Sequence, residues 1–312
     1  MKVICGLNKI KKFPKPVVCL GVFDGMHLGH IRILKDAVKT ARRINGTSIV
    51  VTFCPHPQKK ESLYSLEHRL RLIAEQGVQV CIVINFTESF AKTLAYDFVK
   101  EIVHDKIGAN FVYVGKNFRF GKHAAGSVNF LRKLSSEFNF KLKSFGVLNS
   151  DGKPISSTLI RNLNKSGKLS YAERVLGRPV SVLGTVVHGN SIARKLGYST
   201  ANINPHHEVI PPTGVYAVEA ILEKERLRGI CNIGVRPTFR KPGPIDDSAK
   251  HIEVHVFNFH RNIYGKYIEI QFFKKIREEV KFKNSSLLIK QIKKDINKVK
   301  SLFHLPKKHH NI

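Results

Sequence analysis

The order of apolar and polar positions between residues 17 and 53 changes its period twice. A short apolar run ends at Leu20, and the turn GVFDGMHLGH follows. Apolar residues then recur at helical spacing from Ile31 to Ala41, Gly46 stops that pattern, and SIVVTF resumes an apolar run. Short apolar runs are typical of buried strands, and the spacing between them is typical of an amphipathic helix. The segment is therefore predicted to be a strand–helix–strand unit.

The alternation continues through the N-terminal half. Two more apolar runs, at 78–84 and 111–114, are separated by a helical pattern from about Glu88 to Val103. Strands that alternate with helices in this way are typical of a parallel, doubly wound sheet. The N-terminal half is therefore predicted to be a Rossmann-like α/β domain.

The pattern changes after Gly177. Strand-like runs follow, joined by turns rich in glycine, proline and asparagine: SVLGTVVHG, GVYAVEAILE, RGICNIG, HIEVHVFNF and KYIEIQFF. A helical apolar stripe appears at 285–303. This order is typical of a small antiparallel β-barrel with a C-terminal helix. We expect domains at 1–180 and 181–312, with a linker region at 162–180.

The composition is that of a globular protein with a large excess of positive charge. Among its 312 residues, 53 Lys and Arg face 23 Asp and Glu, which gives a net charge of +30. Such a field attracts nucleic acid, anionic membranes or nucleotide phosphates. The cations are spread along the chain and form no single block, so we expect no specific nucleic-acid partner.

The sequence also points to a compartment. No apolar run approaches the roughly 20 residues that span a bilayer, and the start, MKVICGLNKIKKFPKP, is too short and interrupted for a secretory signal. The five cysteines form no C-x-x-C pair, which favours buried thiols in a reducing compartment. We expect a cytoplasmic protein without a membrane partner; its oligomeric state stays open.

The turn after the first strand carries the first candidate site. A Rossmann-like sheet binds phosphate at this place, because glycines let the backbone approach an anion and the helix N-terminus favours negative charge. Two histidines three positions apart could bind the phosphates of ATP and stabilise attack on the α-phosphate; the alternative is that they only cap the helix or fill space. The candidates are His27 and His30 as catalytic residues and Gly21, Phe23, Asp24 and Gly29 as nucleotide-binding residues.

This turn resembles the H-x-G-H signature of the nucleotidyltransferase superfamily, in the form found in prokaryotic bifunctional riboflavin kinase/FMN adenylyltransferases. The resemblance covers nearly the whole chain. Its N-terminal segments are VTFCPHP (51–57), VGKNFRFGK (114–122) and ISSTLIR (155–161). Its riboflavin kinase segments are GTVVHGNSIARKLGYSTANI (184–203), NIGVRPTF (232–239) and IEVHVFNFHRNIYGKYIEIQFFKKIREEVKF (252–282).

The resemblance implies a flavin-cofactor enzyme with two activities. A nucleotidyltransferase domain would convert FMN and ATP to FAD and pyrophosphate, and the barrel would convert riboflavin and ATP to FMN and ADP, both with Mg²⁺. A nucleotidyltransferase with a decayed kinase barrel is disfavoured, because Thr200, Asn202 and Glu253 are present. A basic nucleic-acid-binding protein is the other alternative, and it lacks cations clustered with aromatic residues.

The N-terminal motifs add candidates for both substrates of adenylyl transfer. Hydroxyls at a helix N-terminus and a following arginine suit phosphate, although an ordinary cap and a surface cation look the same in sequence. An aromatic ring beside a polar side chain suits an isoalloxazine, unless the ring packs under its own loop. The nucleotide-binding candidates are Ser156, Ser157, Thr158 and Arg161, and the flavin-binding candidates are Asn117 and Phe118, with Phe120 as the alternative ring.

The kinase motifs assign the barrel site. Glu253 and His255 lie on one face of an alternating strand, and the resemblance gives Glu253 the role of base toward the ribityl 5′-hydroxyl. The alternative for Glu253 is an exposed carboxylate on a strand. The alternative for Arg277 is a salt bridge at the edge of a helix. The remaining assignments are nucleotide-binding for Gly189, Thr200 and Asn202, Mg²⁺ for Thr200 and Asn202, and flavin-binding for Arg277.

Two positions depart from the family pattern in the kinase nucleotide loop. Ala193 stands where the family has glycine, and Ser199 stands where it has proline. We therefore expect adenylyl transfer to be the better supported of the two activities.

Overall fold

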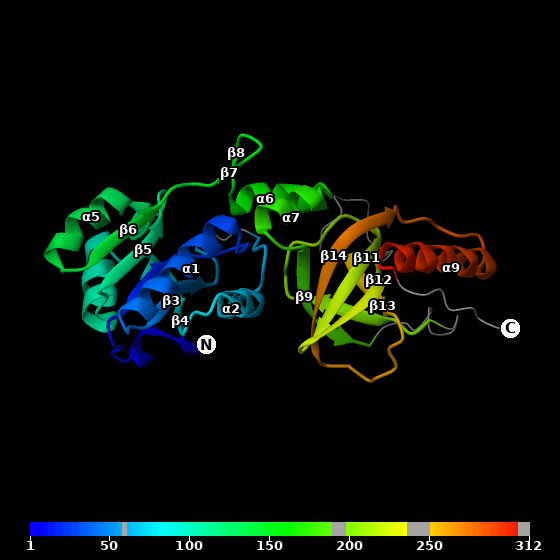
Figure 1. The fold of residues 1–312 in the computed structure, drawn as a ribbon, viewed down its shortest axis with the longest axis horizontal. Coiled ribbons are helices and arrows are strands. Elements are labelled where there is room, and N and C mark those ends of the chain that lie inside the picture. The colour runs from blue at the N-terminus through cyan, green and yellow to red at the C-terminus, as the bar shows by residue number, and fades with distance from the viewer. Residues whose placement is uncertain (58–60, 189–197, 236–249, 305–312) are drawn as a thin grey trace. The chain divides into compact units, whose positions relative to one another are not determined.

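The structure, a computed structural model, describes residues 1–57, 61–188, 198–235 and 250–304 (Figure 1). The chain divides into two compact units, Met1–Ile160 and Arg161–Ile312. The division falls within helix α6 (Ser157–Lys165), at the N-terminal end of the predicted linker region.

Six parallel strands form the sheet of the first unit, in the order β1-β4-β3-β2-β5-β6. Their bounds are Lys2–Cys5 (β1), Val17–Leu20 (β2), Ser48–Cys54 (β3), Val80–Asn85 (β4), Phe111–Gly115 (β5) and Lys141–Phe145 (β6). With α1 (Leu28–Arg43) between β2 and β3, the predicted strand–helix–strand unit is confirmed. The edge strands β1 and β6 escape the sequence pattern, because an edge strand such as KLKSF is largely exposed and carries no continuous apolar run.

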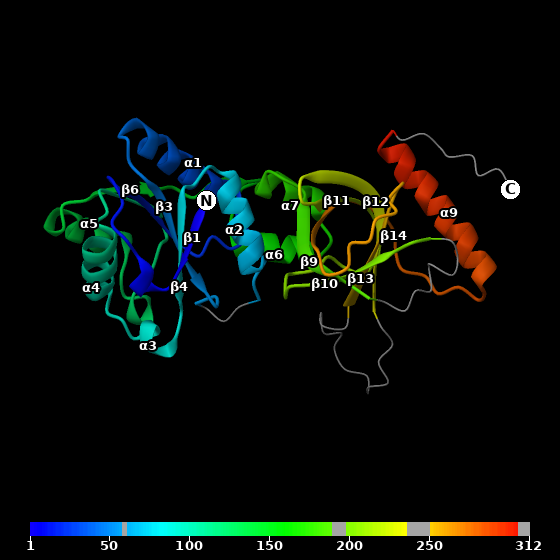
Figure 2. The ribbon, with the colours of Figure 1, turned by 90° about the horizontal axis from the view of Figure 1, so that it is seen from below.

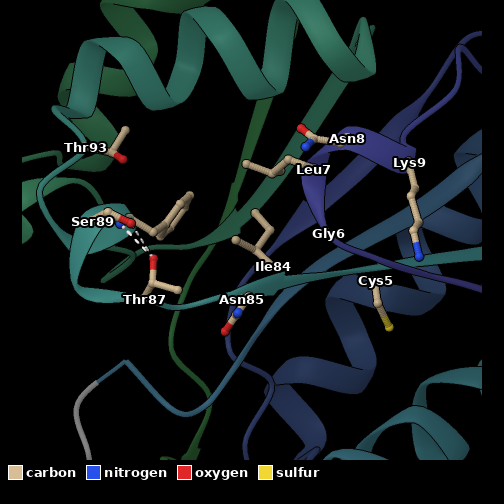
Figure 3. Close-up of a pocket in the computed structure, with 11 residues that line it drawn as sticks. Cys5, Gly6, Leu7, Asn8, Lys9, Ile84, Asn85, Thr87, Ser89 and Thr93 are labelled. Atoms are coloured by element: carbon tan, nitrogen blue, oxygen red, sulfur yellow. Dashed lines mark hydrogen bonds between the residues drawn. The ribbon is translucent and has the colours of Figure 1, made fainter.

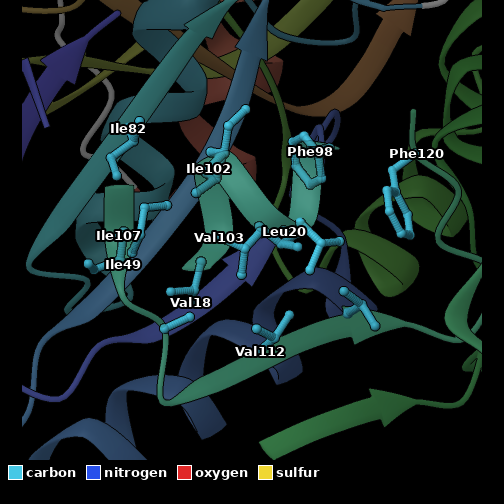
Figure 4. Packing of buried hydrophobic residues seen from close by; sticks show 14 of the residues in the cluster. Val18, Leu20, Ile49, Ile82, Phe98, Ile102, Val103, Ile107, Val112 and Phe120 are labelled. Atoms are coloured by element: carbon cyan, nitrogen blue, oxygen red, sulfur yellow. The ribbon is translucent and has the colours of Figure 1, made fainter. Parts of the chain in front are cut away.

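The core of the first unit lies on the sheet face that packs against η2 (Phe98–Ile107) and α5 (Val128–Glu137). Alternate residues of the central strands, such as Val18 and Leu20, meet Ile102 and Val103 of η2 there (Figure 4). The opposite face carries α1, where the Thr40 and Tyr113 hydroxyls hydrogen-bond at 2.8 Å. Helices thus cover both faces of the sheet, as a doubly wound fold requires.

The helix predicted from Glu88 to Val103 is broken into α3 (Glu88–Ala91), α4 (Ala95–Asp97) and η2. A second loop docks at the break, where the Lys122 N–H donates to the Thr93 carbonyl at 2.7 Å. A Cβ on Gly121 would lie 2.6 Å from the Ala95 Cα. The close approach of this loop, which no local periodicity reveals, accounts for the interruption.

Short elements complete the first unit and lead into the second. They are η1 (Leu7–Lys9), α2 (Leu66–Glu75), η3 (Lys122–Ala124), β7 (Asn149–Ser150), β8 (Lys153–Pro154) and α7 (Leu169–Leu176).

The second unit is a closed antiparallel barrel in the order β10-β13-β12-β11-β14-β9 (Figure 2). The strands are β9 (Val180–Val187), β10 (Ala201–Pro205), β11 (Gly214–Leu222), β12 (Glu225–Val235), β13 (Lys250–Val256) and β14 (Tyr267–Arg277). Helix α9 (Ser285–Leu302) packs its Ile296 and Val299 against Val215 and Ile276 of the barrel. The predicted barrel and C-terminal helix are confirmed.

Candidate active sites

The loop between β2 and α1 has an unusual backbone. Phe23, Gly25 and Met26 have φ values of 56°, 81° and 42°, and all three side-chain positions are buried. A Cβ on Gly25 would lie 2.7 Å from the Leu63 side chain, so both its φ and its surroundings require glycine. The Phe23 ring also packs under Gly21, whose Cβ would meet it at 3.2 Å. Phe23 and Gly21 thus help to shape the loop.

The two histidines meet at the N-terminus of α1. His27 is the N-cap residue, and its Nδ1 accepts the His30 N–H at 3.4 Å. The two imidazoles stack with centroids 3.7 Å apart, and the Phe23 ring meets His30 edge-on at 5.3 Å. Gly29 leaves room for this stack, since a Cβ there would lie 3.1 Å from the His27 ring. The arrangement combines two imidazoles with the positive end of a helix, which suits an anion.

Asp24 is buried and holds the loop to the segment before α2. Its Oδ1 accepts the Leu63 N–H at 2.8 Å and the Tyr64 N–H at 3.4 Å. The Asp24 carbonyl accepts the Ser157 hydroxyl at 2.6 Å. These bonds show Asp24 as an anchor of the loop; its predicted contact with nucleotide stays a prediction.

The structure brings the start of α6 to the same loop. Ser157 reaches Asp24, while the Ser156 Oγ accepts the Leu159 N–H at 3.2 Å in the manner of an N-cap. Thr158 is exposed, and Arg161 follows one turn later as the first residue of the second unit. The predicted second wall of the nucleotide site therefore joins the first through Ser157.

The predicted flavin residues follow β5. Asn117 is exposed in a tight turn, which the Phe118 N–H closes by donating to the Gly115 carbonyl at 2.9 Å. The Phe118 and Phe120 rings stack with centroids 5.4 Å apart. Phe120 is buried in the core and packs against Gly126 of its own loop, so Phe118 is the better candidate for a flavin contact.

A pocket of about 540 Å³ lies elsewhere on the first unit, at the carboxyl ends of β1 and β4 (Figure 3). None of the predicted site residues lines it. Its lining combines apolar side chains with hydroxyls and amides, and the Thr87 and Ser89 hydroxyls hydrogen-bond at 2.7 Å. Local sequence patterns do not reveal it, because its residues come from two segments far apart in the chain: Cys5, Gly6, Leu7, Asn8, Lys9, Ile84, Asn85, Thr87, Ser89, Phe90 and Thr93.

The barrel site is a row of polar side chains across three adjacent strands. Glu253 on β13 is in register with Asn202 on β10 and with Asn232 on β12. Such cross-strand partners have Cβ atoms about 4.5–5.5 Å apart on the same face. The predicted alternation along β13 is confirmed, since Ile252 and Val254 are buried while Glu253 is partly exposed. Asn232 is a candidate that the sequence reasoning did not single out, although it begins the segment NIGVRPTF, and strand register places it beside Glu253.

Asn202 has a buried amide oxygen that is available to a ligand. Its side chain is 9% exposed, and its Oδ1 is buried with no hydrogen-bond partner within the described ranges. Thr200 is partly buried two positions earlier, just before β10. An amide oxygen and a hydroxyl are donors that Mg²⁺ accepts, so these two residues fit the predicted metal. Gly189 and Ala193 lie outside the described residues.

Two histidines flank Glu253 on its strand. The His255 Nδ1 hydrogen donates to the Ser199 carbonyl at 2.8 Å, which fixes the chain just before Thr200. Burial lowers the pKa of His255 below its usual range, against the opposing effect of that hydrogen bond. The His251 Nε2 lies 3.9 Å from the Glu253 Oε1, beyond hydrogen-bond distance. His255 therefore supports the predicted metal ligands from a neighbouring strand.

Arg277 lies at the end of β14 and pairs with α9. Its Nε donates to the Asp295 Oδ2 at 2.8 Å, and Asp295 is buried and also accepts the Gln291 amide. The Arg277 Nη1 donates to the Glu278 carbonyl at 2.9 Å. The salt-bridge alternative is therefore present in the structure, and the flavin contact of Arg277 stays a prediction.

Both units carry polar groups of the kinds that suit phosphate chemistry, the histidine pair in the first unit and the polar row in the second. The sequence profile described as FAD synthetase matches residues 9–159, and the one described as riboflavin kinase matches residues 176–303. The chain belongs to the family of bacterial bifunctional riboflavin kinase/FMN adenylyltransferases and carries both activities, from riboflavin to FMN and from FMN to FAD.

Individual relatives agree along the full length. The bifunctional riboflavin kinase/FMN adenylyltransferase of Buchnera aphidicola subsp. Schizaphis graminum is 36% identical over 98% of this chain and 100% of its own. The Escherichia coli K12 protein of the same name is 33% identical over 98% and 99%. A solved structure described as a macrolide-efflux protein from Streptococcus pneumoniae superimposes with a TM-score of 0.79 at 27% identity, over 95% of this chain and 97% of that one. Across the described ranges of the present chain, every helix is too short or too polar to span a membrane.

Proposed function

We propose that the two reactions use separate sites, adenylyl transfer at the β2–α1 loop and phosphorylation at the polar row of the barrel. The observation that supports this division most strongly is the stacked pair of His27 and His30 at the N-terminus of α1, in a different unit from Glu253. Each unit thus has its own groups for phosphate chemistry.

At the β2–α1 loop, an oxygen of the FMN phosphate attacks the α-phosphorus of ATP, and the bond to pyrophosphate breaks. The loop N–H groups, the N-terminus of α1 and the two imidazoles stabilise the negative charge that builds on the α-phosphate. Ser157 keeps the start of α6 against the loop through its bond to the Asp24 carbonyl. Phe118 and Asn117 hold the flavin, and Thr158 and Arg161 bind phosphate oxygens.

At the barrel, Glu253 accepts the proton of the ribityl 5′-hydroxyl as its oxygen attacks the γ-phosphorus of ATP, and ADP leaves. Thr200 and Asn202 would hold Mg²⁺, which neutralises charge on the ATP phosphates when bound. The unpartnered Asn202 Oδ1 supports that assignment. His255 keeps the approach to Thr200 in place through the Ser199 carbonyl.

The enzyme works in the cytoplasm on small-molecule substrates. Because its net charge is +30, any binding of nucleic acid is driven by the release of counterions. The affinity of such binding falls steeply with salt and does not depend on the nucleotide sequence. A tight, sequence-selective complex at physiological salt would contradict this part of the proposal.

The His30→Ala variant tests the division of sites. With riboflavin and Mg-ATP, we expect FMN to accumulate at the wild-type rate while FAD formation is lost, as measured by separating the flavins after incubation. His104→Ala is the matched control, because His104 is an exposed histidine of the same unit that pairs with Asp105. Unchanged FAD formation in His30→Ala would mean that adenylyl transfer does not take place at this loop.

A further inference from the structure

Arg69 of α2 is buried behind the β2–α1 loop, with 3% of its surface exposed. Its Nη1 donates to the Val22 carbonyl at 2.7 Å and to the Thr52 Oγ1 at 3.1 Å. Its Nη2 donates to the Phe53 carbonyl at 3.1 Å. The guanidinium therefore joins the start of the loop to the carboxyl end of β3.

These bonds fix the entry to the loop from two sides. The Val22 carbonyl also accepts the Thr52 hydroxyl at 2.9 Å, so both of its lone pairs are engaged. Val22 directly precedes Phe23, where φ becomes positive. His27 and His30 follow within eight residues, so the orientation of the Val22 carbonyl sets where the loop begins its path toward both imidazoles.

Arg69 forms no direct ion pair within the described part of the chain. All three acceptors are neutral, and no carboxylate lies within 4 Å of the guanidinium among the described residues. Burial lowers the pKa of Arg69, with the charge of Asp24 opposing it, but a guanidinium stays protonated at physiological pH. Burial raises the pKa of the neighbouring Cys81 thiol to about 12, so Cys81 supplies no negative charge.

A buried cation without a directly paired counterion is costly, and an apolar side chain often replaces a buried charge without loss of stability. The Arg69 Nε is itself buried without a hydrogen-bond partner in the described part of the chain. The structural reason for arginine at this position is therefore the set of hydrogen bonds to Val22, Thr52 and Phe53. The carboxylates of Asp24 and Glu67, which lie beyond 4 Å, offset part of this charge, and an anion bound on the loop would offset more of it.

We propose that Arg69 is a positioning residue for FMN adenylyl transfer. It fixes the Val22 carbonyl so that the loop presents His27 and His30, and its buried positive charge favours the triphosphate of ATP from behind the loop. The inference rests on the proposed function of that loop. Arg69 does not touch the reacting atoms, and its effect is exerted through the loop and through the electrostatic potential.

The test compares Arg69→Met and Arg69→Lys with wild type in both reactions. We expect Arg69→Met to raise the KM for ATP in FAD formation by about tenfold or more and to lower kcat. Arg69→Lys should restore most of the KM, because the charge remains, but not kcat, because one ammonium group cannot reproduce the fork that spans Val22 and Phe53. Arg71→Met, a change of the same kind on the same helix at a partly exposed position, should leave both reactions unchanged.

The kinase reaction of the same molecules reports on folding, since the barrel is a separate unit. An Arg69→Met enzyme with a lower melting temperature but an unchanged KM for ATP in FAD formation would overturn the inference, because Arg69 would then be structural only. Equal KM values in Arg69→Lys and Arg69→Met would overturn the role of the charge, even where Arg69→Met folds poorly. FAD formation by His30→Ala would instead overturn the proposed function of the loop.

Discussion

The β2–α1 loop and the barrel row are built in opposite ways. In the loop, most of the motif holds the backbone: Phe23 is buried, Gly25 fits where a Cβ would clash, and the Asp24 carboxylate accepts two backbone N–H groups. In the barrel, hydrogen bonds between neighbouring strands already hold the backbone, and the side chains of Asn202 and Glu253 lie on one face of these paired strands.

A motif residue can therefore serve a site either by shaping it or by reacting in it. Substitutions in the loop should change stability and adenylyl transfer together. Substitutions in the barrel row should change the kinase reaction alone, because they leave the ladder intact.

The largest effect is expected for Glu253→Gln. The amide keeps the shape but cannot accept the proton of the attacking hydroxyl, so FMN formation should fall by about 100-fold or more. FAD formation from supplied FMN and the melting temperature should stay at wild-type values. Glu219→Gln is the control, since Glu219 is a barrel-strand carboxylate whose partner is Arg226. A parallel loss of both reactions in a folded Glu253→Gln enzyme would contradict the separation of sites.

The next effect concerns stability. Gly25→Ala adds a Cβ at a φ of 81° and 2.7 Å from the Leu63 side chain, so it should destabilise the first unit by about 2–4 kcal/mol and reduce FAD formation. Gly152→Ala has a similar φ of 73° with no atom within 4 Å of the added Cβ, so it should cost only about 1 kcal/mol. Urea unfolding of both variants measures the contrast. Equal losses would show that the packing of the loop against Leu63 contributes nothing.

A smaller effect depends on pH. Because burial lowers the pKa of His255, the unfolded chain binds a proton more readily than the native barrel does. The contribution of His255 is therefore complete above its ordinary pKa near 6.5 and is lost as the pH falls through the lower pKa of the folded state. Unfolding curves between pH 7.5 and 5 should show less dependence on pH in His255→Gln than in wild type. The same dependence of unfolding free energy on pH in both proteins would contradict the lowered pKa of His255.

The smallest effect is expected for Ser199→Pro. Proline keeps the carbonyl that accepts from His255 and restricts the free chain before Thr200, so the KM of the kinase for ATP should fall by about two- to fivefold. Adenylyl transfer should not change, which initial rates of FAD formation from FMN can verify. A weaker use of ATP by the kinase would mean that the chain at residue 199 follows a different path from that of the family, and the assignment of Thr200 and Asn202 would lose support.

Much of the fold was predictable because its strands and helices bury regular apolar patterns. The buried strands β2 to β5 and helix α1 follow from local periodicity, and so does the alternation around Glu253. The break between α3 and α4 was not predictable, because it depends on Gly121 docking from a loop about 25 residues further along. The edge strands β1 and β6 could be recognised only from their pairing with neighbouring strands.

The candidate chemical groups could be found from the sequence, because the histidine pair, the carboxylate and the hydroxyl and amide donors stand in motifs whose spacing is local. The side chains that support them became visible only in the folded chain. Arg69 reaches Val22 across 47 positions, and Asn232 meets Glu253 only through the register of β12 and β13. The physical reason is that hydrogen bonds and charges act over a few ångströms in space, whatever the separation along the chain.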